Sequence, residues 1–197
     1  SRLFQFQLTL LAENTTKVEF DKLIGQPVAV ELDLPGTKKR HFHGLCSRLT
    51  EGKRDDTFTR YRMEIVPQFW LLTRRTQSRI FQQLSVPDIL KKVVKGLDVT
   101  FDLKGKYYPR DYLVQYRETD FDFASRLMEE EGIYYYFTHG PKGHAMVVAD
   151  APNGHRDVPE IPNARYDDSR GGNRPDLRVM DWEKEQELRS GKVTLWD

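Results

Sequence analysis

Two histidines and the single cysteine of the chain have a spacing that could suit a metal ion. His41, His43 and Cys46 follow the pattern H-x-H-x2-C, and imidazole nitrogen and thiolate sulfur are ligands that zinc prefers. Alternate residues of a β-strand point to the same face, so a regular strand would separate Cys46 from the two histidines. No second pair of ligands follows nearby. We therefore expect a structural role for these residues and no metal site.

Five carboxylates gather in a short stretch of the chain. Asp120 and Asp122 are followed by Glu129, Glu130 and Glu131, and two facing carboxylates are the catalytic pair of glycoside hydrolases. Adjacent residues of a helix radiate around its axis, however, and the glutamates would lie at the negative end of the helix dipole. This favours a solvated surface or contact with a basic partner. A peptidoglycan hydrolase remains the first alternative.

A basic and aromatic segment lies upstream. Arg74, Arg75 and Arg79 follow Phe69 and Trp70, a combination that binds single-stranded nucleic acid on some barrels. The chain as a whole has 31 basic against 30 acidic residues and a net charge of +1, which gives no overall attraction to nucleic acid. We expect these arginines to pair with acids, including the carboxylates above, or to line a subunit contact. A nucleic-acid-binding barrel module remains the second alternative.

Several sequence motifs of catalysis are missing. The chain contains no G-x-x-x-x-G-K-[ST], no G-x-S-x-G and no H-E-x-x-H, the patterns of phosphate-binding loops, nucleophile elbows and zinc proteases. We therefore expect no catalytic, cofactor-binding or metal-binding residues, no cofactor and no enzymatic activity. The run of Tyr134, Tyr135 and Tyr136 alternates between two faces of a strand, so at least one ring faces away from the core or toward a neighbour.

The composition is that of a folded, water-soluble protein. Of 197 residues, 38% are hydrophobic and 31% charged, which predicts one large domain or two small ones. A single cysteine, Cys46, excludes an internal disulfide and fits folding in a reducing compartment. No apolar run approaches the roughly 18 residues of a membrane helix, and no cleavable signal follows Ser1.

The N-terminal part predicts a meander of β-strands. Hydrophobic residues alternate with polar ones over 4–10, 28–34, 40–49 and 57–69, which is the period of a half-buried strand. Gly25-Gln26-Pro27 and Pro35-Gly36 mark turns between them. Four or five antiparallel strands at this spacing predict a small β-barrel.

Two helices are predicted in the middle of the chain. Ser85 can cap a short helix that ends near Gly96, and Thr119 with Asp122 forms a capping-box pattern for a second helix that ends at Gly132. The remaining periodic segments predict strands and a hairpin, at 99–103, 113–117, 133–137 and 145–149. A polar connector covers 150–175, and two further strands are predicted at 177–182 and 192–196.

One long segment resembles a known family. Residues Tyr116 to Phe137, YRETDFDFASRLMEEEGIYYYF, closely resemble the signature of VgrG spike proteins. Arg40 to Leu45 (RHFHGL), Trp70 to Arg75 (WLLTRR) and Arg79 to Gln82 (RIFQ) are similar to the same family in the same order. Together these stretches reach across most of the chain.

The resemblance implies a fold like the hub protein of contractile phage baseplates. That fold is α+β, mostly β, with a small antiparallel β-barrel followed by an α/β region. Here residues 1–80 would form the first barrel, 81–175 the α/β middle region and connector, and 176–197 the first strands of an incomplete second barrel. The OB-fold and needle of the family lie beyond these residues, so piercing is not expected of them.

The resemblance also implies a structural function in type VI secretion. Three copies would form a homotrimer whose ring connects a threefold spike to the hexameric tail-tube protein, driven by burial of apolar faces between protomers. The residues of this subunit interface are not identified by the sequence.

Further partners and a location follow from the same resemblance. The downstream spike or needle domain and secreted effectors would be partners, nucleic acid would not, and a membrane would be contacted only by puncture. The protein would be made in the bacterial cytoplasm, assembled in the secretion apparatus and secreted.

Overall fold

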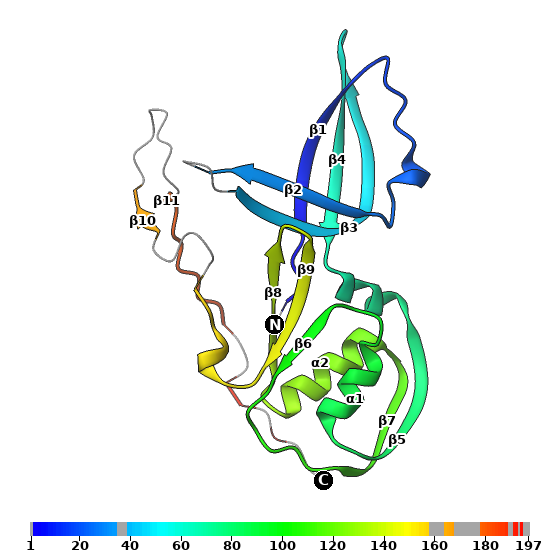
Figure 1. Cartoon of the computed structure of the whole chain (residues 1–197), viewed down its shortest axis with the longest axis vertical. Coiled ribbons are helices and arrows are strands. Elements are labelled where there is room, and N and C mark those ends of the chain that lie inside the picture. The colour runs from blue at the N-terminus through cyan, green and yellow to red at the C-terminus, as the bar shows by residue number, and fades with distance from the viewer. Residues whose placement is uncertain are drawn as a thin grey trace. The chain divides into compact units, whose positions relative to one another are not determined.

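The computed structural model describes residues 2–34, 39–157, 164–167, 178–188, 191–192 and 194 (Figure 1). The chain divides into two units, of which the first comprises 1–33 with 39–156 and the second 34–38 with 157–197. The first unit contains a four-stranded sheet and an α/β part. The described residues form more strands than helices, and the strands contain more residues in total. The fold is therefore mostly β, as the sequence predicts.

The N-terminal meander forms one antiparallel sheet with the strand order β1-β4-β3-β2. Its strands are β1 (Phe6–Glu13), β2 (Pro27–Asp33), β3 (Lys39–Arg54) and β4 (Phe58–Val66). The alternating sequence places one set of side chains on a common face, because β1 pairs Leu8 with Met63 and Leu10 with Tyr61 of β4. The core on this face consists of Cys46, Leu49, Tyr61, Met63 and Ile65.

The sheet differs in two details from the sequence prediction. The strand predicted over 57–69 ends at Val66, because Pro67 has no N–H to donate and a 3-10 helix, η2 (Gln68–Arg74), follows. The turn predicted at Pro35-Gly36 lies outside the described residues. Within the described part, β1 and β2 form the two edges and do not pair with each other.

The α/β part of the first unit follows η2. It contains β5 (Thr76–Leu84), α1 (Val86–Val93), β6 (Val99–Asp102), β7 (Arg110–Thr119), α2 (Asp120–Glu130), β8 (Tyr134–Gly140), β9 (Gly143–Ala149) and the short η3 (Pro152–Gly154). Strands β5 and β7 form an antiparallel pair, whereas β9 pairs in parallel with β6 and antiparallel with β8. Strand β5 is not predicted by the sequence pattern. Arginine and glutamine occupy several of its positions, so hydrophobic and polar residues do not alternate clearly.

Both predicted helices are confirmed, together with their caps. The hydroxyl of Thr119 accepts a hydrogen bond from the Asp122 N–H at 3.0 Å and donates one to the Asp122 carboxylate at 2.6 Å. Ser85 accepts from the Asp88 N–H at 3.4 Å in the same way. Gly132 has a φ of 68°, the left-handed conformation that ends a helix and that glycine adopts most easily.

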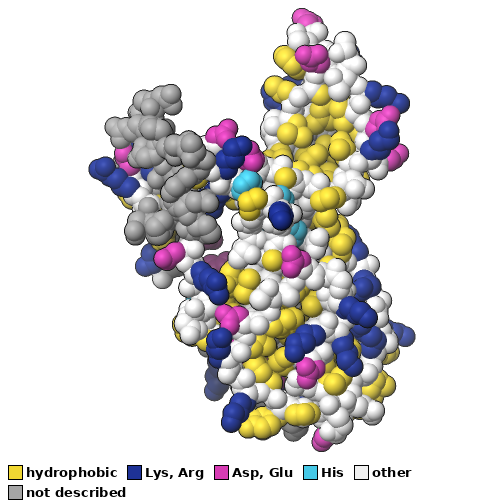
Figure 2. Space-filling model, viewed as in Figure 1, with side chains coloured by type: hydrophobic (Ala, Val, Ile, Leu, Met, Phe, Trp, Pro, Cys, Tyr) yellow, Lys and Arg dark blue, Asp and Glu magenta, His cyan; other side chains and the backbone are white. Residues whose placement is uncertain are grey.

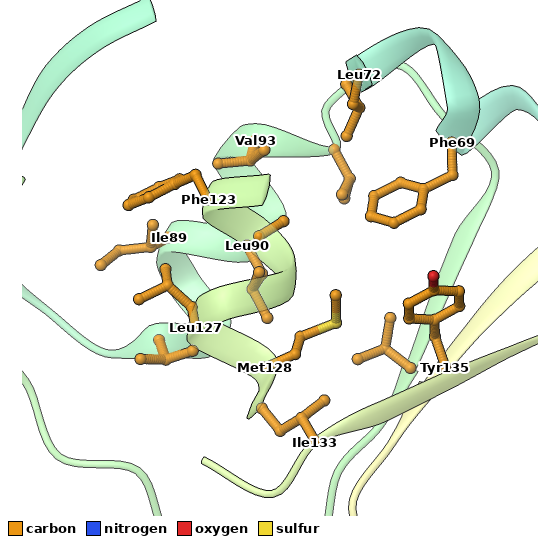
Figure 3. Close-up of a cluster of buried hydrophobic side chains, with 14 of the residues drawn as sticks. Phe69, Leu72, Ile89, Leu90, Val93, Phe123, Leu127, Met128, Ile133 and Tyr135 are labelled. Atoms are coloured by element: carbon orange, nitrogen blue, oxygen red, sulfur yellow. The ribbon is translucent and has the colours of Figure 1, made fainter. Parts of the chain in front are cut away.

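The two helices pack against each other and against the strands to form the main core (Figure 3). The core residues labelled in Figure 3 are Phe69, Leu72, Ile89, Leu90, Val93, Phe123, Leu127, Met128, Ile133 and Tyr135. Phe123, Leu127, Ile89 and Val93 are completely buried. Burial of side chains of this size contributes roughly 1.5–3 kcal/mol each, so this core is the main source of stability in the α/β part.

The second unit is described by itself. Its strands β10 (Arg165–Tyr166) and β11 (Arg178–Val179) pair in parallel, and Arg178 forms an ion pair with Asp167 at 3.4 Å. Of the strand predicted over 177–182, only these two residues of β11 are strand within the described part, and most of the strand predicted over 192–196 lies outside it. Among the described helices, none is both long and apolar enough to cross a lipid bilayer.

A substitution of Gly44 tests the close approach of β3 and β4. A Cβ atom on this residue would lie 2.6 Å from the Val66 carbonyl oxygen and would also clash with the Ile65 side chain. We expect Gly44→Ala to lower the free energy of unfolding by about 2 kcal/mol, because backbone atoms must shift. Urea unfolding measures this, and Gly143→Ala in β9, where the Cβ meets no atom within 4 Å, is the control. Equal stability of the two variants would contradict the close approach.

Candidate functional site

The most buried charged group in the described chain is the carboxylate of Asp120. Asp120 is the first residue of α2, directly after the capping residue Thr119, and its side chain has no exposed surface. Its backbone N–H donates to the Arg75 carbonyl oxygen at 2.8 Å. This backbone hydrogen bond alone already connects the start of α2 to the end of η2.

Three side chains donate hydrogen bonds to the Asp120 carboxylate. Arg79 Nη2 lies 2.6 Å and Gln115 Nε2 2.8 Å from Oδ1, and Arg75 Nε contacts Oδ2. The donors also bind one another and the backbone, because Arg79 Nε donates to Gln115 Oε1 at 2.9 Å and Arg75 Nη2 donates to the Val93 carbonyl at 3.1 Å. We call Asp120, Arg75, Arg79 and Gln115 the carboxylate cluster.

The carboxylate cluster connects segments that are far apart in the sequence. Arg75 follows η2, Arg79 lies in β5, Gln115 in β7 and Asp120 in α2, and Val93 ends α1. Both carboxylate oxygens are occupied by donors of the same chain. A carboxylate in this state has no free oxygen for a substrate, so the arrangement serves to hold elements together.

Of the other acids of the predicted cluster, Glu130 and Glu131 form ion pairs with arginines, and Asp122 binds the Thr119 hydroxyl. Arg110 binds Glu130 and Glu131 at 2.6 Å each, and Arg126 binds Glu118 at 2.7 Å and Glu130 at 3.3 Å. Burial raises the pKa of Glu130, but hydrogen bonds and charge from Arg110 and Arg126 outweigh burial and lower that pKa. The basic partners of these glutamates are thus Arg110 and Arg126, and only Asp120 binds the arginines suggested by the sequence.

The three arginines near Trp70 do not form a common basic surface. Arg75 and Arg79 turn toward Asp120, whereas the guanidinium of Arg74 lies over the Trp70 ring, 4.5 Å from its centre. A groove for single-stranded nucleic acid needs unpaired cations and stacking rings along one path. Here Arg75 and Arg79 instead bind Asp120, and Arg74 contacts Trp70. Two of the three arginines thus pair with an acid, as expected from the sequence.

On β3, Cys46 lies apart from the two histidines of the possible zinc pattern, whose rings stack with centres 6.2 Å apart. Cys46 is buried in the core of the sheet, which raises the pKa of its thiol. His41 Nδ1 lies 3.6 Å from Glu31 on the neighbouring β2. The described residues contain no group of three or more histidine, cysteine or acidic side chains that could hold a metal ion.

Two histidines outside the predicted motifs connect the β8–β9 hairpin to other segments, His139 to β3 of the sheet and His144 to η2. His139 Nδ1 in β8 accepts a hydrogen bond from the His43 N–H at 3.0 Å, and His144 Nε2 in β9 accepts one from the Gln68 N–H at 3.0 Å. Burial is the main cause that lowers the pKa of both rings, for His139 from its usual 6.5 to about 4. Their partners are 96 and 76 residues away in sequence, so no local pattern could reveal them.

The tyrosine run divides as the alternation of a strand requires. Tyr135 enters the main core, where its ring centre lies 5.3 Å from that of Phe69, and burial raises its pKa to about 12. Tyr134 and Tyr136 point to the other face and donate to the carbonyl oxygens of Ala151 and Gly154, at 2.7 and 2.9 Å. All three rings contact their own chain, which confirms packing as their main role.

Exposed apolar side chains of the first unit include a group on each of two sheets. On the four-stranded sheet, Leu10 and Leu32 belong to the apolar faces of the edge strands and are 37% and 45% exposed. Figure 2 shows hydrophobic side chains gathered over this sheet. On the β5–β7 pair, Ile80, Tyr112 and Tyr116 are more than half exposed. Exposed side chains of this kind are enriched in protein contacts.

Comparison with protein families gives a match over the whole chain. The model of the family described as phage tail baseplate hub (GPD) matches residues 1–197. Among curated proteins, the type VI secretion system spike proteins VgrG1c and VgrG1a of Pseudomonas aeruginosa are each 40% identical over 199 residues, which covers 100% of this chain. The chain spans 27% and 31% of their lengths, less than a third in each case.

Solved structures show the same fold. The E. coli c3393 protein, described as a type VI secretion component with structural similarity to the T4 bacteriophage tail proteins gp27 and gp5, matches with a TM-score of 0.73 and 26% identity. This match covers 84% of the chain and 45% of c3393. A Francisella PdpA-VgrG complex matches with a TM-score of 0.53 at 16% identity, over 75% of this chain and 25% of the other, and supports the fold alone. The expected hub-like, mostly β fold is thereby confirmed.

Replacement of Asp120 tests the carboxylate cluster. We expect Asp120→Asn to lower the free energy of unfolding by about 2 kcal/mol, because the buried side chain loses its charge-assisted hydrogen bonds and its amide N–H group would face the donors of Arg75, Arg79 or Gln115. Thermal or urea unfolding measures the difference. Glu129→Gln, an exposed position on the same helix, should change stability by less than about 0.5 kcal/mol. Equal free energies of unfolding for the two variants would contradict a stabilising role of the carboxylate cluster.

Proposed function

Because the chain belongs to the phage tail baseplate hub family, we propose that it is a structural module at the base of the spike of a type VI secretion apparatus. The observation that carries this proposal is the 40% identity to two Pseudomonas spike proteins over the entire chain. The proposed role is assembly: three copies form a homotrimer that connects a threefold spike to the hexameric tail-tube protein.

The use of polar groups in the described chain supports assembly over catalysis. Most of the side chains that prompted the hydrolase and nucleic-acid alternatives bind within the chain: Asp120 binds Arg75 and Arg79, and Glu130 and Glu131 bind Arg110. Apolar side chains are also accessible, among them Leu10 and Leu32 on the sheet and Ile80 on the β5–β7 pair. A protein that works by contact needs such surfaces, whereas an enzyme needs free polar groups in a pocket.

Closure of the first sheet into a barrel is part of the proposal. Strands β1 and β2 are both edges, and β1 has neither lysine nor proline, the residues that commonly protect an edge from pairing. We infer that a further strand covers these edges in the complete protein. The proposed domain division is the one that the family resemblance implies: a first barrel about 1–80, an α/β region and connector about 81–175, and the start of a second barrel from 176.

The proposed partners extend beyond the trimer. Complexes named PdpA-VgrG in Francisella are examples of a spike protein bound to another protein. For the protein that contains this chain, the partners would be the tail tube, the spike or needle domain and secreted effectors. It would be made in the cytoplasm, assembled in the apparatus and secreted, with a membrane contacted by puncture only.

The mass of the full-length protein in solution tests the proposed assembly. We expect light scattering after size exclusion to give three times the mass of one chain, because a closed ring satisfies all contacts between identical neighbours. A monomer that persists as protein concentration rises would contradict the proposal. Equilibrium sedimentation at several loading concentrations separates these outcomes.

A matched pair of substitutions on β1 tests barrel closure. Leu10 lies on the apolar face of the sheet and Leu11 on the opposite face, with 37% and 61% exposure. If a further strand covers the apolar face, Leu10→Asp in the full-length protein should cost about 2 kcal/mol or more, because a charge becomes buried, whereas Leu11→Asp should cost little. Thermal unfolding of both variants decides. Similar melting temperatures for the two would exclude a covering strand.

A further inference from the structure

A small cluster of aromatic and histidine rings joins the four-stranded sheet to the α/β part. We call it the histidine joint; it consists of His43 on β3, His139 on β8 and His144 on β9, with the rings of Phe4, Phe6, Phe42 and Phe137. The ring centres of His139 and His144 are 6.0 Å apart, and that of Phe4 lies 5.1 and 5.7 Å from them. Figure 1 shows the tip of the β8–β9 hairpin reaching β3.

Both hydrogen bonds of the joint depend on neutral histidines. The Nδ1 atom of His139 accepts from the backbone N–H of His43, and Nε2 of His144 accepts from the backbone N–H of Gln68. A nitrogen can accept only while it carries no proton, so each ring must hold its single proton on the other nitrogen. Protonation at the accepting atom would replace each hydrogen bond by two N–H groups that face each other.

The surroundings of the joint offer little compensation for a positive charge. The charged and titratable groups that face it are Arg40, His41 and His43 from β3, Asp98 ahead of β6, and Lys142 of the β8–β9 turn, which lines the same hollow as His144. His43 Nε2 is itself buried without a hydrogen-bond partner among the described residues. Of these groups only Asp98 favours a charged ring, and it acts on His144. Glu31 contacts His41 on the sheet and is 45% exposed.

We propose that the histidine joint is an acid-sensitive latch: protonation of His139 and His144 releases the β8–β9 hairpin from β3 of the four-stranded sheet and from the Gln68 segment that follows β4, while the helical core stays folded. The proton that each ring takes up comes from solvent, and no covalent bond changes. The latch gives the module two states, one in which the sheet is held and one in which it can turn about the link at Pro67. This property does not depend on the proposed role in assembly.

The pH range of the latch follows from the sign of the pKa change. In the closed joint the pKa of His139 is lowered to about 4, and in an opened joint the ring returns toward its usual 6.5. The open state therefore binds more protons between these values, so the closed state is fully stable above about pH 6.5 and loses stability as pH falls toward 4. One such ring favours opening by more than about tenfold between pH 7 and pH 5.

Hydrogen exchange followed by mass spectrometry tests the latch in the whole protein. After correction for intrinsic exchange rates, we expect protection of the segments 40–46 and 66–70 to fall at least about tenfold from pH 7 to pH 5. Protection of α1 and α2 should stay constant over the same range, because their core contains no histidine.

A double variant preserves the hydrogen bonds but cannot titrate. The side-chain oxygen of Asn can take the place of Nδ1 and that of Gln the place of Nε2, so His139→Asn with His144→Gln keeps two acceptors. We expect this variant to lose the pH dependence of the two segments. The control is His155→Gln, because His155 stacks on Tyr134 and lies outside the joint; it should behave like the parent protein.

Three results would overturn the proposal: protection of 40–46 and 66–70 that does not change with pH, loss of protection in the helices at the same pH, or unchanged pH dependence in the double variant. If the double variant does not fold, titration of the histidine Cε1–H signals by NMR in the parent protein replaces it. A midpoint near 4 for His139 and a lowered midpoint for His144, each moving together with the amide signal of His43 or Gln68, would support the latch. Ordinary midpoints near 6.5 would refute it.

Discussion

The α/β part depends on one buried carboxylate. Asp120 alone among the described acids has no exposed surface, and the donors that compensate it come from separate elements: Arg75 after η2, Arg79 on β5 and Gln115 on β7. A buried charge is tolerated only when all of these donors are in place, so the carboxylate cluster fixes where η2 ends, how β5 and β7 pair and where α2 begins. The apolar core between α1 and α2 supplies most of the stability, whereas the carboxylate cluster fixes the positions of η2, β5, β7 and α2 relative to one another.

The four-stranded sheet is attached by a different kind of contact. Its joint with the α/β part contains aromatic rings and neutral imidazoles in place of ion pairs, and the covalent link near Pro67 is short. The two parts of the first unit are thus each held firmly inside and joined by weaker, titratable contacts. This division suits a module whose parts must keep their shape while their arrangement adapts to neighbours.

Much of the fold follows from local sequence. The alternation over β1 and β2 and the capping residues Ser85 and Thr119 predict elements that the structure confirms, because each depends on neighbours within a few residues. The sequence pattern does not predict strand β5, because one of its inward-facing residues is a charged arginine. Arg79 is partly buried there since it forms an ion pair with Asp120, which is distant in sequence. The sequence shows that acids and arginines are concentrated in two segments. It does not predict which acid binds which arginine, because these contacts depend on how the strands pair.

The long reach of the first strand has a consequence for synthesis. Strand β1 pairs with β4, and the ring of Phe4 contacts that of Phe137 edge to face and lies near His144. On the ribosome, β1 has no partner until Val66 has emerged, and Phe4 has none of these ring contacts until the hairpin tip follows. Contacts this distant in sequence slow folding and leave an apolar edge open meanwhile. A nascent chain of this module is therefore a natural client for chaperones that shield unpaired strands.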